Sequence, residues 1–230
     1  MNELDFMSDT MRQLLGGLPI TLQLAVISIS CGIVLAVLLA ALRRSCRLGE
    51  WFVRGYVFVL RGSPLLLQIF FVYYGLGQFA VVRESVLWPF LRQPWWCAIL
   101  ALTFNTGAYG SEIVRGGLNA VPPGAIEAAR VAGMSRLTLY RRIVLPIALR
   151  YALPAYGNEM VIMVKSTSLA SIVTLMEVTG IAAAIIAETY RALEVFLCAG
   201  AIYLVLNFLL TRAIAGLERW LNPHLRRVHA

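Results

Sequence analysis

The chain has 230 residues, of which 60% are hydrophobic and only 14% are charged, a composition too apolar for an ordinary soluble domain. Its formal net charge of +8 comes from arginines that lie beside the ends of apolar runs rather than in one soluble patch, so lipid headgroups and membrane topology account for them and nucleic-acid binding is disfavoured. His224 and His229 both lie in the tail and the four cysteines have no paired spacing, which leaves no plausible metal site.

Long uncharged runs predict an all-α membrane protein with five transmembrane helices. A hydrocarbon core of roughly 30 Å takes about 20 helical residues to cross. The first run follows an acidic N-terminus and is too long for the apolar core of a secretory signal, so we expect an uncleaved first span. An amphipathic stretch at 50–61 is expected to lie along the inner membrane surface before the second span. The predicted spans are residues 18–42, 64–82, 95–115, 151–173 and 194–212.

The fourth span is the least regular, because Pro154 and Gly157 interrupt it and Glu159 and Lys165 lie within it. It is required all the same, since without it the basic connections cannot all lie on one side of the membrane. Residues 178–187 are too few for a sixth span and predict a short outer-side or re-entrant helix.

The arginines of the connections predict the orientation. They concentrate in the loop after the first span, in the loop after the third span and in the tail, whereas the N-terminus and the other two connections are poor in positive charge. The positive-inside rule therefore places the N-terminus outside and the C-terminus inside. We see no internal repeat or linker and expect one transmembrane domain over residues 1–230.

A polar segment at residues 122–149 lies between the third and fourth spans, on the predicted cytoplasmic side. Residues 122–124 read Pro-Pro-Gly and break the preceding helix, residues 125–132 predict a helix of barely two turns that stops at Gly133, and Ser135 can cap a second helix. So short a helix is unstable alone in water, because nucleation outweighs its few hydrogen bonds.

The short helix therefore needs a surface to lie against. Ala128, Ala129 and Ala132 give it a shallow face that a groove of another protein could approach, and Glu127 favours the positive end of the helix dipole. The alternative is a solvated loop helix packed on its own bundle.

The spacing in this segment resembles the EAA loop of permease subunits of ATP-binding-cassette (ABC) importers, which reads EAA, three residues, G, nine residues, I, one residue, LP. Stretches such as RGSPLLLQIFFVYYGL at 61–76 and LPAYGNEMVIMVKSTSLASIV at 153–173 resemble the subfamily that imports polar amino acids, of the histidine and arginine type, and opines. The matching positions are Glu127, Ala128, Ala129, Gly133, Ile143, Leu145 and Pro146.

The resemblance implies a transport subunit and not an enzyme. The EAA helix would be a coupling helix that docks on a cytoplasmic ABC ATPase subunit, in an inner-membrane complex with a second permease subunit, homologous or identical, and a periplasmic substrate-binding protein. ATP and Mg would be bound by the ATPase, since a phosphate loop needs Gly-Lys-Ser or Gly-Lys-Thr and the only lysine, Lys165, follows Val164. The alternatives are a permease for methionine or another small solute, a membrane-embedded enzyme, and a secondary transporter or channel.

Charged side chains within a span cost about 2.5 to 3.5 kcal/mol each at the bilayer centre, so Glu159 and Lys165 need partners or a watery path. They are six residues apart, about 120° around a helix, and are not expected to pair unless Gly157 unwinds the backbone. Asn158 and Lys165 are expected to share one face of the helix, and Glu159 and Ser166 another.

A second polar stripe is expected in the third span, where Asn105, Tyr109 and Glu112 follow helical spacing. We hypothesise that Glu159, with Asn158 and Asn105, lines the substrate path and meets the substrate's ammonium or guanidinium group, while Lys165 or the N-terminus of a broken helix meets the carboxylate. The alternative is that these groups tie the spans together or hold a gate, with the Lys165–Ser166 stretch as a structural hinge.

Overall fold

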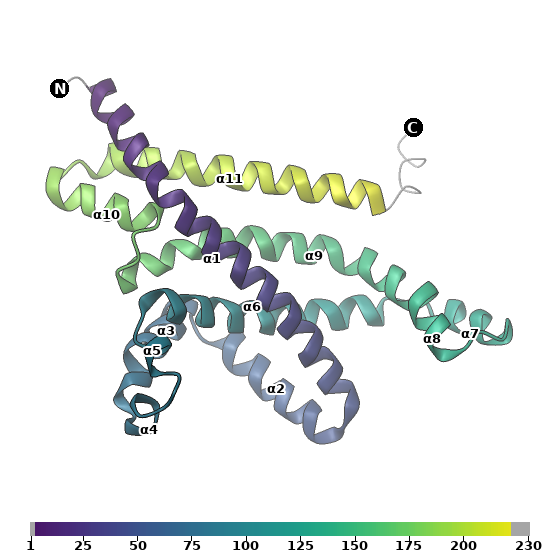
Figure 1. Ribbon diagram of the computed structural model, residues 1–230. Helices are drawn as coiled ribbons and strands as arrows, with labels where there is room; N and C mark the ends of the chain where they lie inside the picture. The colour runs from purple at the N-terminus through teal and green to yellow at the C-terminus, as the bar shows by residue number, and fades with distance from the viewer. Residues whose placement is uncertain (1–2, 222–230) are drawn as a thin grey trace.

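The computed structural model describes residues 3–221, and over that range it consists of helices and connections without a β-strand. The predicted all-α class is therefore confirmed for these residues, whereas His224 and His229 lie outside them. In Figure 1, α9 lies between α6 and α11, and α1 crosses this layer obliquely. The helices are α1 (Glu3–Ser45), α2 (Arg47–Gly62), α3 (Leu65–Phe70), α4 (Ala80–Arg83), α5 (Trp88–Leu91), α6 (Pro94–Asn119), α7 (Pro123–Val131), α8 (Arg136–Leu139), α9 (Leu145–Ser166), α10 (Val178–Thr189) and α11 (Ala192–Leu221).

Hydropathy and length identify some of these helices as spans by themselves. Of the described helices, α1 and α11 are long and apolar enough, and two bent pairs bring the number to four: α2 with Leu65–Gln78, bent by 106°, and Arg136–Val173 with α10, bent by 47°. The central helix α6 is not counted, because polar and small residues in its middle lower its mean hydropathy. The five-span topology stays a prediction.

Helix α6 is polar in its middle because neighbouring helices cover it. Thirteen of its residues are buried, among them Asn105 and Thr106. The backbones approach closely at glycines: a Cβ on Gly32 would lie 2.6 Å from Thr106 Cγ2, and a Cβ on Gly117 would lie 2.6 Å from the carbonyl oxygen of Ala148. Small residues at helix crossings give this kind of close contact, which drives association in membranes.

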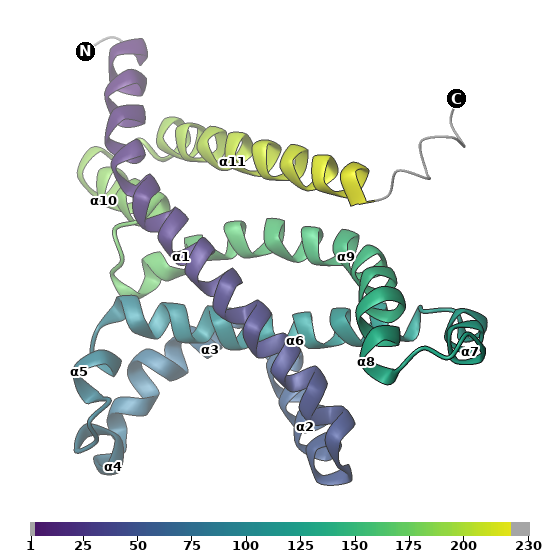
Figure 2. The ribbon, with the colours of Figure 1, turned by 45° about the vertical axis from the view of Figure 1, so that its right-hand side comes forward.

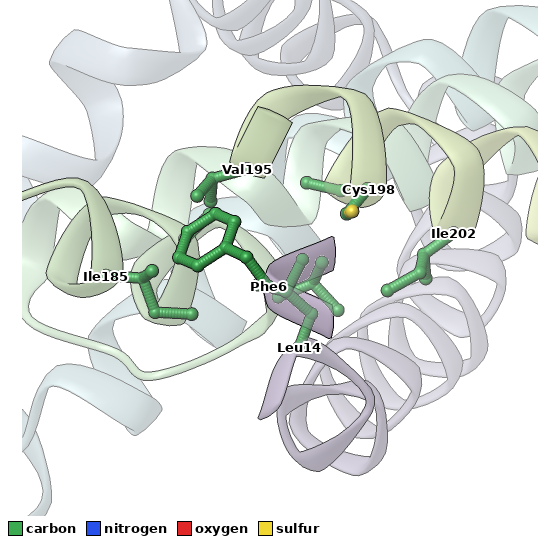
Figure 3. Packing of buried hydrophobic residues seen from close by; sticks show 9 residues of the cluster. Phe6, Leu14, Ile185, Val195, Cys198 and Ile202 are labelled. Atoms are coloured by element: carbon green, nitrogen blue, oxygen red, sulfur yellow. The ribbon is translucent and has the colours of Figure 1, made fainter. Parts of the chain in front are cut away.

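Helix α1 extends well before the predicted start of the first span at residue 18. Its first turns are not free, because Phe6 and Leu14 pack into a buried cluster with residues of α10 and α11 (Figure 3). The guanidinium carbon of Arg191 lies 4.1 Å from the centre of the Phe6 ring, a cation–π contact. Helix α10 lies where the sequence predicts a short helix, and it forms one side of this cluster.

Residues 50–61 form the predicted helix, and other helices pack against one side of it. The sequence predicts an amphipathic helix along the membrane surface, but in the structure α2 packs against α1 and α6, with Val53 fully buried and the Tyr56 hydroxyl donating to the carbonyl of Phe104 at 2.6 Å. Its large apolar side chains Trp51, Phe52 and Phe58 are exposed, so a position along the membrane surface stays a prediction. An amphipathic pattern is the same whether the apolar face meets lipid or another helix.

A fully buried carboxylate, Glu177, ties α1, α10 and α11 together. It caps α10, with Oε1 accepting from the backbone N–H of Gly180 at 2.8 Å. Its Oε2 accepts from the Tyr203 hydroxyl of α11 at 2.8 Å and lies 3.4 Å from the Thr21 hydroxyl of α1. Removing a carboxylate from such a site leaves a buried N–H unpaired and takes an acceptor from two hydroxyls.

We therefore expect Glu177→Ala to destabilise the chain by about 3 kcal/mol, because the Gly180 N–H loses its acceptor and the Tyr203 and Thr21 hydroxyls keep only their bonds with Thr179 and Gly17. At this chain length, the thermal midpoint in detergent should fall by about 6 to 12 °C. Fluorescence-detected size-exclusion after a heating series measures the midpoint. The control is Glu188→Ala, since Glu188 is exposed on the same helix and should change the midpoint little. Equal midpoints for the two variants would show that the Glu177 contacts do not hold the helices together.

Candidate functional site: a coupling segment and an intramembrane polar cluster

The short helix of the polar segment ends in a Schellman motif, in which a residue with positive φ closes the helix by two backbone bonds. Gly133 has φ +73°, its N–H donates to the carbonyl of Arg130 at 3.0 Å, and the N–H of Met134 donates to the carbonyl of Ala129 at 3.1 Å. The predicted stop of α7 at Gly133 is confirmed. Ser135 then caps α8 through an Oγ that accepts from the Thr138 N–H at 3.3 Å, also as predicted.

One side of α7 packs on the chain's own bundle and the other is open. Ala129 is buried in a cluster with Val121, Leu139, Val144 and Ala148. It therefore cannot belong to an outward face with Ala128 and Ala132, as the sequence predicts, because the helix turns its Cβ inward. The open side carries Glu127, Ala128, Val131 and Ala132, and Val131 is 89% exposed.

The remaining residues of the EAA pattern lie in or directly after a π turn over Tyr140–Val144: Ile143 is within the turn, and Leu145 and Pro146 follow it. Pro146 lies in the first turn of α9, where it has no N–H to donate and its ring would crowd the carbonyl four residues earlier. The wider π turn directly before it is a common accommodation of such a conflict. Ile143 packs against the buried cluster, whereas Leu145 and Pro146 are exposed. Figure 2 shows α7 and α8 projecting at the end of α6 and α9 away from α10.

A second group of polar residues lies where α2 breaks before α3. This polar cluster consists of Arg61, Gln68, Asn105 and Tyr109. The break frees carbonyl groups of the last turn of α2, which must find donors if they are not in water. The Gln68 amide donates to the carbonyls of Leu60 and Ser63 at 2.7 and 3.1 Å, and the Asn105 amide donates to Gln68 Oε1 at 3.0 Å. Asn105 therefore ties α6 to the broken pair. Sequence reasoning missed Gln68, although it is an amide within an uncharged run just after a Gly-Ser-Pro break.

Arg61 also lies at this break, and the sequence alone suggested only the inner-surface start of a span. Its guanidinium carbon is 4.8 Å from the centre of the Tyr109 ring. Glu159 of α9 lies near the level of this ring along α6. Arg61 itself is exposed on the described chain, so its guanidinium is open to a further partner.

The register of α6 against α9 explains why Glu159 reaches this cluster. Gly117 meets Ala148, and a Cβ on Gly110 would lie 3.4 Å from Tyr156, so the two helices are antiparallel. Glu159 consequently lies near the level of Asn105 to Tyr109. It is only 6% exposed, and no hydrogen bond from residues 3–221 reaches its carboxylate.

The other predicted path residues lie elsewhere. Asn158 and Lys165 are exposed and line two separate cavities along α11, of about 250 and 320 Å³. Their predicted shared face is confirmed. Ser166 is half-buried in the last turn of α9, and Glu112 is held by ion pairs with Arg43 and Arg115. Helix α9 runs through Gly157 without unwinding, and that glycine lets Ile214 of α11 approach closely.

An all-helical bundle with an exposed capped helix at one end and a polar cluster at a helix break has the architecture of a membrane transport permease. The chain belongs to the family described as "Binding-protein-dependent transport system inner membrane component", whose model matches residues 32–223.

Among individual relatives, the chain is similar to permeases of opine and arginine transport systems. The chain is 56% identical over 226 residues to the octopine transport system permease protein OccM of Rhizobium meliloti, covering 96% of this chain and 91% of that protein. It is 50% identical over 226 residues to the nopaline transport system permease protein NocM of Agrobacterium fabrum, covering 97% and 94%. The arginine ABC transporter permease protein ArtM of Escherichia coli is 44% identical over 170 residues, covering 74% and 76%.

Solved structures share the fold. A chain of an amino acid ABC transporter crystallised with histidines superposes with a TM-score of 0.83 at 30% identity, covering 95% of this chain and 98% of that one. A chain of the MetNI methionine ABC transporter superposes with a TM-score of 0.69 at 20% identity, which is a likeness of fold alone.

Proposed function

We infer that this chain is the transmembrane permease subunit of an ATP-driven importer of polar amino acids or opines. The observation that carries this inference is the coincidence of an open, capped α7 bearing the EAA spacing with 56% identity along 96% of the chain to an octopine permease. The chain is a transport subunit and not an enzyme. Among the alternatives, the methionine permease shares only the fold at 20% identity, which favours the amino-acid and opine class.

The proposed arrangement is a single transmembrane domain over residues 1–230 in a bacterial inner membrane, with five spans, the N-terminus outside and the C-terminus inside. Two permease subunits, identical or homologous, would enclose one path, and a periplasmic binding protein would deliver the substrate. ATP and Mg would be bound on two ABC ATPase subunits. Glu127 and Ala128 on the open side of α7 would contact the ATPase, while Ala129, Gly133, Ile143, Leu145 and Pro146 hold that helix in place.

The proposed substrate path passes the cluster around Arg61. Glu159 would meet the cationic group of the substrate, and the exposed Arg61 guanidinium, stacked on Tyr109, would meet its carboxylate. Asn105 would keep the helix break in shape through Gln68. A carboxylate and a guanidinium near one level of the bundle suit a zwitterionic solute and disfavour an inorganic anion.

Asn158, Lys165 and Ser166 have a weaker part in this proposal. Asn158 and Lys165 would line the seam between α9 and α11 on the way to or from the cluster, and Ser166 would lie beside it at the end of α9. Their separation from Glu159 supports the hinge alternative for Lys165 and Ser166.

Copurification tests the function. The tagged chain, purified from its native host, should bring down an ABC ATPase subunit. After reconstitution, ATP hydrolysis should rise when a binding protein loaded with a polar amino acid or opine is added to the outer side. A chain that purifies without an ATPase and transports on an ion gradient would instead be a secondary transporter.

Thiol labelling tests the orientation. Cys46 caps α2 at the predicted cytoplasmic end of α1, where the N–H of Gly49, and then the Ser45 hydroxyl, lower the pKa of its thiol and so raise its thiolate fraction at neutral pH. Cys97 and Cys198 are buried, and Cys31 is exposed only within the predicted first span. A membrane-impermeant maleimide should label inside-out vesicles and spare intact spheroplasts, and Cys46→Ser should remove the label. Labelling of Cys46 in intact spheroplasts would reverse the topology.

A further inference from the structure

A groove lies between α1, α6 and α9 on a side of the bundle that the polar cluster does not use. Its volume is about 440 Å³, within the roughly 300 to 1,000 Å³ of ligand pockets. Its walls are aliphatic and come from three helices that are distant in sequence. The groove residues used below are Ala41, Arg44, Leu118, Tyr140, Leu149 and Ala152.

The groove has one polar end. The end of α1, the end of α6 and the turn before α9 meet beside the polar segment 122–149, the proposed coupling segment, and they carry Arg44, Leu118 and Tyr140. Ala152 lies further along α9, toward the opposite end of the groove. From Tyr140 to Ala152 the helix rises by about 18 Å, close to half of the roughly 30 Å hydrocarbon core. The groove therefore has the depth of one leaflet and an aliphatic interior.

Arg44, at the polar end of the groove, has no charged partner among residues 3–221. The neighbouring Arg43 is engaged by Glu112, but none of the ion pairs formed within residues 3–221 includes Arg44, which is exposed. The Tyr140 hydroxyl at the same end makes no hydrogen bond with a described residue, so a donor accompanies the guanidinium. A guanidinium and a hydroxyl above an aliphatic slot complement a phosphate that carries an acyl chain.

We propose that this groove binds an anionic phospholipid of the inner leaflet, with its phosphate at Arg44 and Tyr140 and one acyl chain along Leu149 and Ala152. The location at the inner leaflet rests on the proposed orientation. The aliphatic walls exclude the polar solute of the transport path, which would lose its hydration there without gaining hydrogen bonds. The bound lipid would lie against the π turn that joins the coupling segment to α9.

Photo-crosslinking tests the proposal on the intact chain. p-Benzoylphenylalanine is placed at Leu149, which is 54% exposed and lines the groove, in vesicles of equimolar phosphatidylglycerol and phosphatidylcholine. Mass spectrometry should find phosphatidylglycerol enriched about fivefold in the crosslinked lipid, the ratio expected for one arginine near an anionic headgroup. The same probe at Leu204, which is 73% exposed on α11 outside the groove, should report the bulk ratio.

Matched variants separate the effect of the Arg44 charge from the effect of the aliphatic groove. Arg44→Gln should remove the enrichment and Arg44→Lys should keep it, while the control Arg47→Gln, an exposed arginine outside the groove lining, should leave it unchanged. Ala41→Phe should fill the slot and lower the total lipid crosslinked at Leu149.

Two outcomes would overturn the proposal. Lipid crosslinked in the bulk ratio at Leu149 would mean ordinary annular contact, and crosslinks to a second copy of the chain would make the groove a permease interface. Because the assay requires neither ATP hydrolysis nor uptake, its result does not depend on the substrate or on the ATPase. Cys46 labelling reports the orientation separately.

Discussion

Glu159→Gln should leave the transporter assembled in the membrane and lower uptake of a cationic amino acid or opine by about 30-fold or more. The side chain is buried, receives no hydrogen bond from the described residues and lies near the level of Tyr109, against which Arg61 packs, so its charge is available to a substrate. Removing one partner of a buried charge pair costs about 2 to 5 kcal/mol, which corresponds to at least this factor. Initial rates of radiolabelled uptake, normalised to the amount of chain in the membrane, measure the effect.

Conservative variants distinguish a role in binding from a role in folding. Glu159→Asp keeps the charge and should retain part of the uptake. Glu188→Gln neutralises an exposed carboxylate outside the cluster and should leave uptake unchanged. The affinity of the substrate for the binding protein should be the same with all variants. Normal uptake of a cationic substrate by Glu159→Gln at wild-type expression would remove this residue from the path.

Gly133→Val should lower coupled uptake about tenfold while the chain still reaches the membrane. The φ of +73° disfavours a β-branched side chain by about 1 to 3 kcal/mol, and no atom lies within 4 Å of the added Cβ, so the effect comes from the backbone and not from crowding. The two bonds that close α7 would be lost with the left-handed conformation. ATP hydrolysis stimulated by the loaded binding protein and uptake should fall together.

The matched variant for this position is Gly133→Asn, because asparagine tolerates the left-handed region and can end a helix. It should retain most of the activity that valine removes. Equal activity in the two variants, whether normal or absent, would show that the conformation at Gly133 does not control coupling.

Local features were predicted well from the sequence. The end of α7 at Gly133, the Ser135 cap and the helix after Glu177 are confirmed, because each depends on a few neighbouring residues and on backbone hydrogen bonds within one or two turns. The membrane class is equally direct, since uncharged runs of this length have no other stable environment.

Helix partners could not be predicted in the same way. The amphipathic pattern of 50–61 did not indicate that α2 packs against α6, and the alanines of α7 could not be divided into buried Ala129 and open Ala128. Gln68 became meaningful only when the break before α3 placed two free carbonyls within its reach.

The sequence by itself determined that this chain is an apolar helical protein with a short, capped polar segment. It also determined that charged groups lie within the predicted spans, where they need partners. Only the tertiary structure decided which neighbours these groups have: Glu159 is buried near the level of Tyr109 of α6, while Asn158 and Lys165 face α11. The physical reason is that helical spacing sets the angle between side chains on one helix, whereas the rotation of that helix against its neighbours is set by close packing at positions such as Gly117 and Gly157.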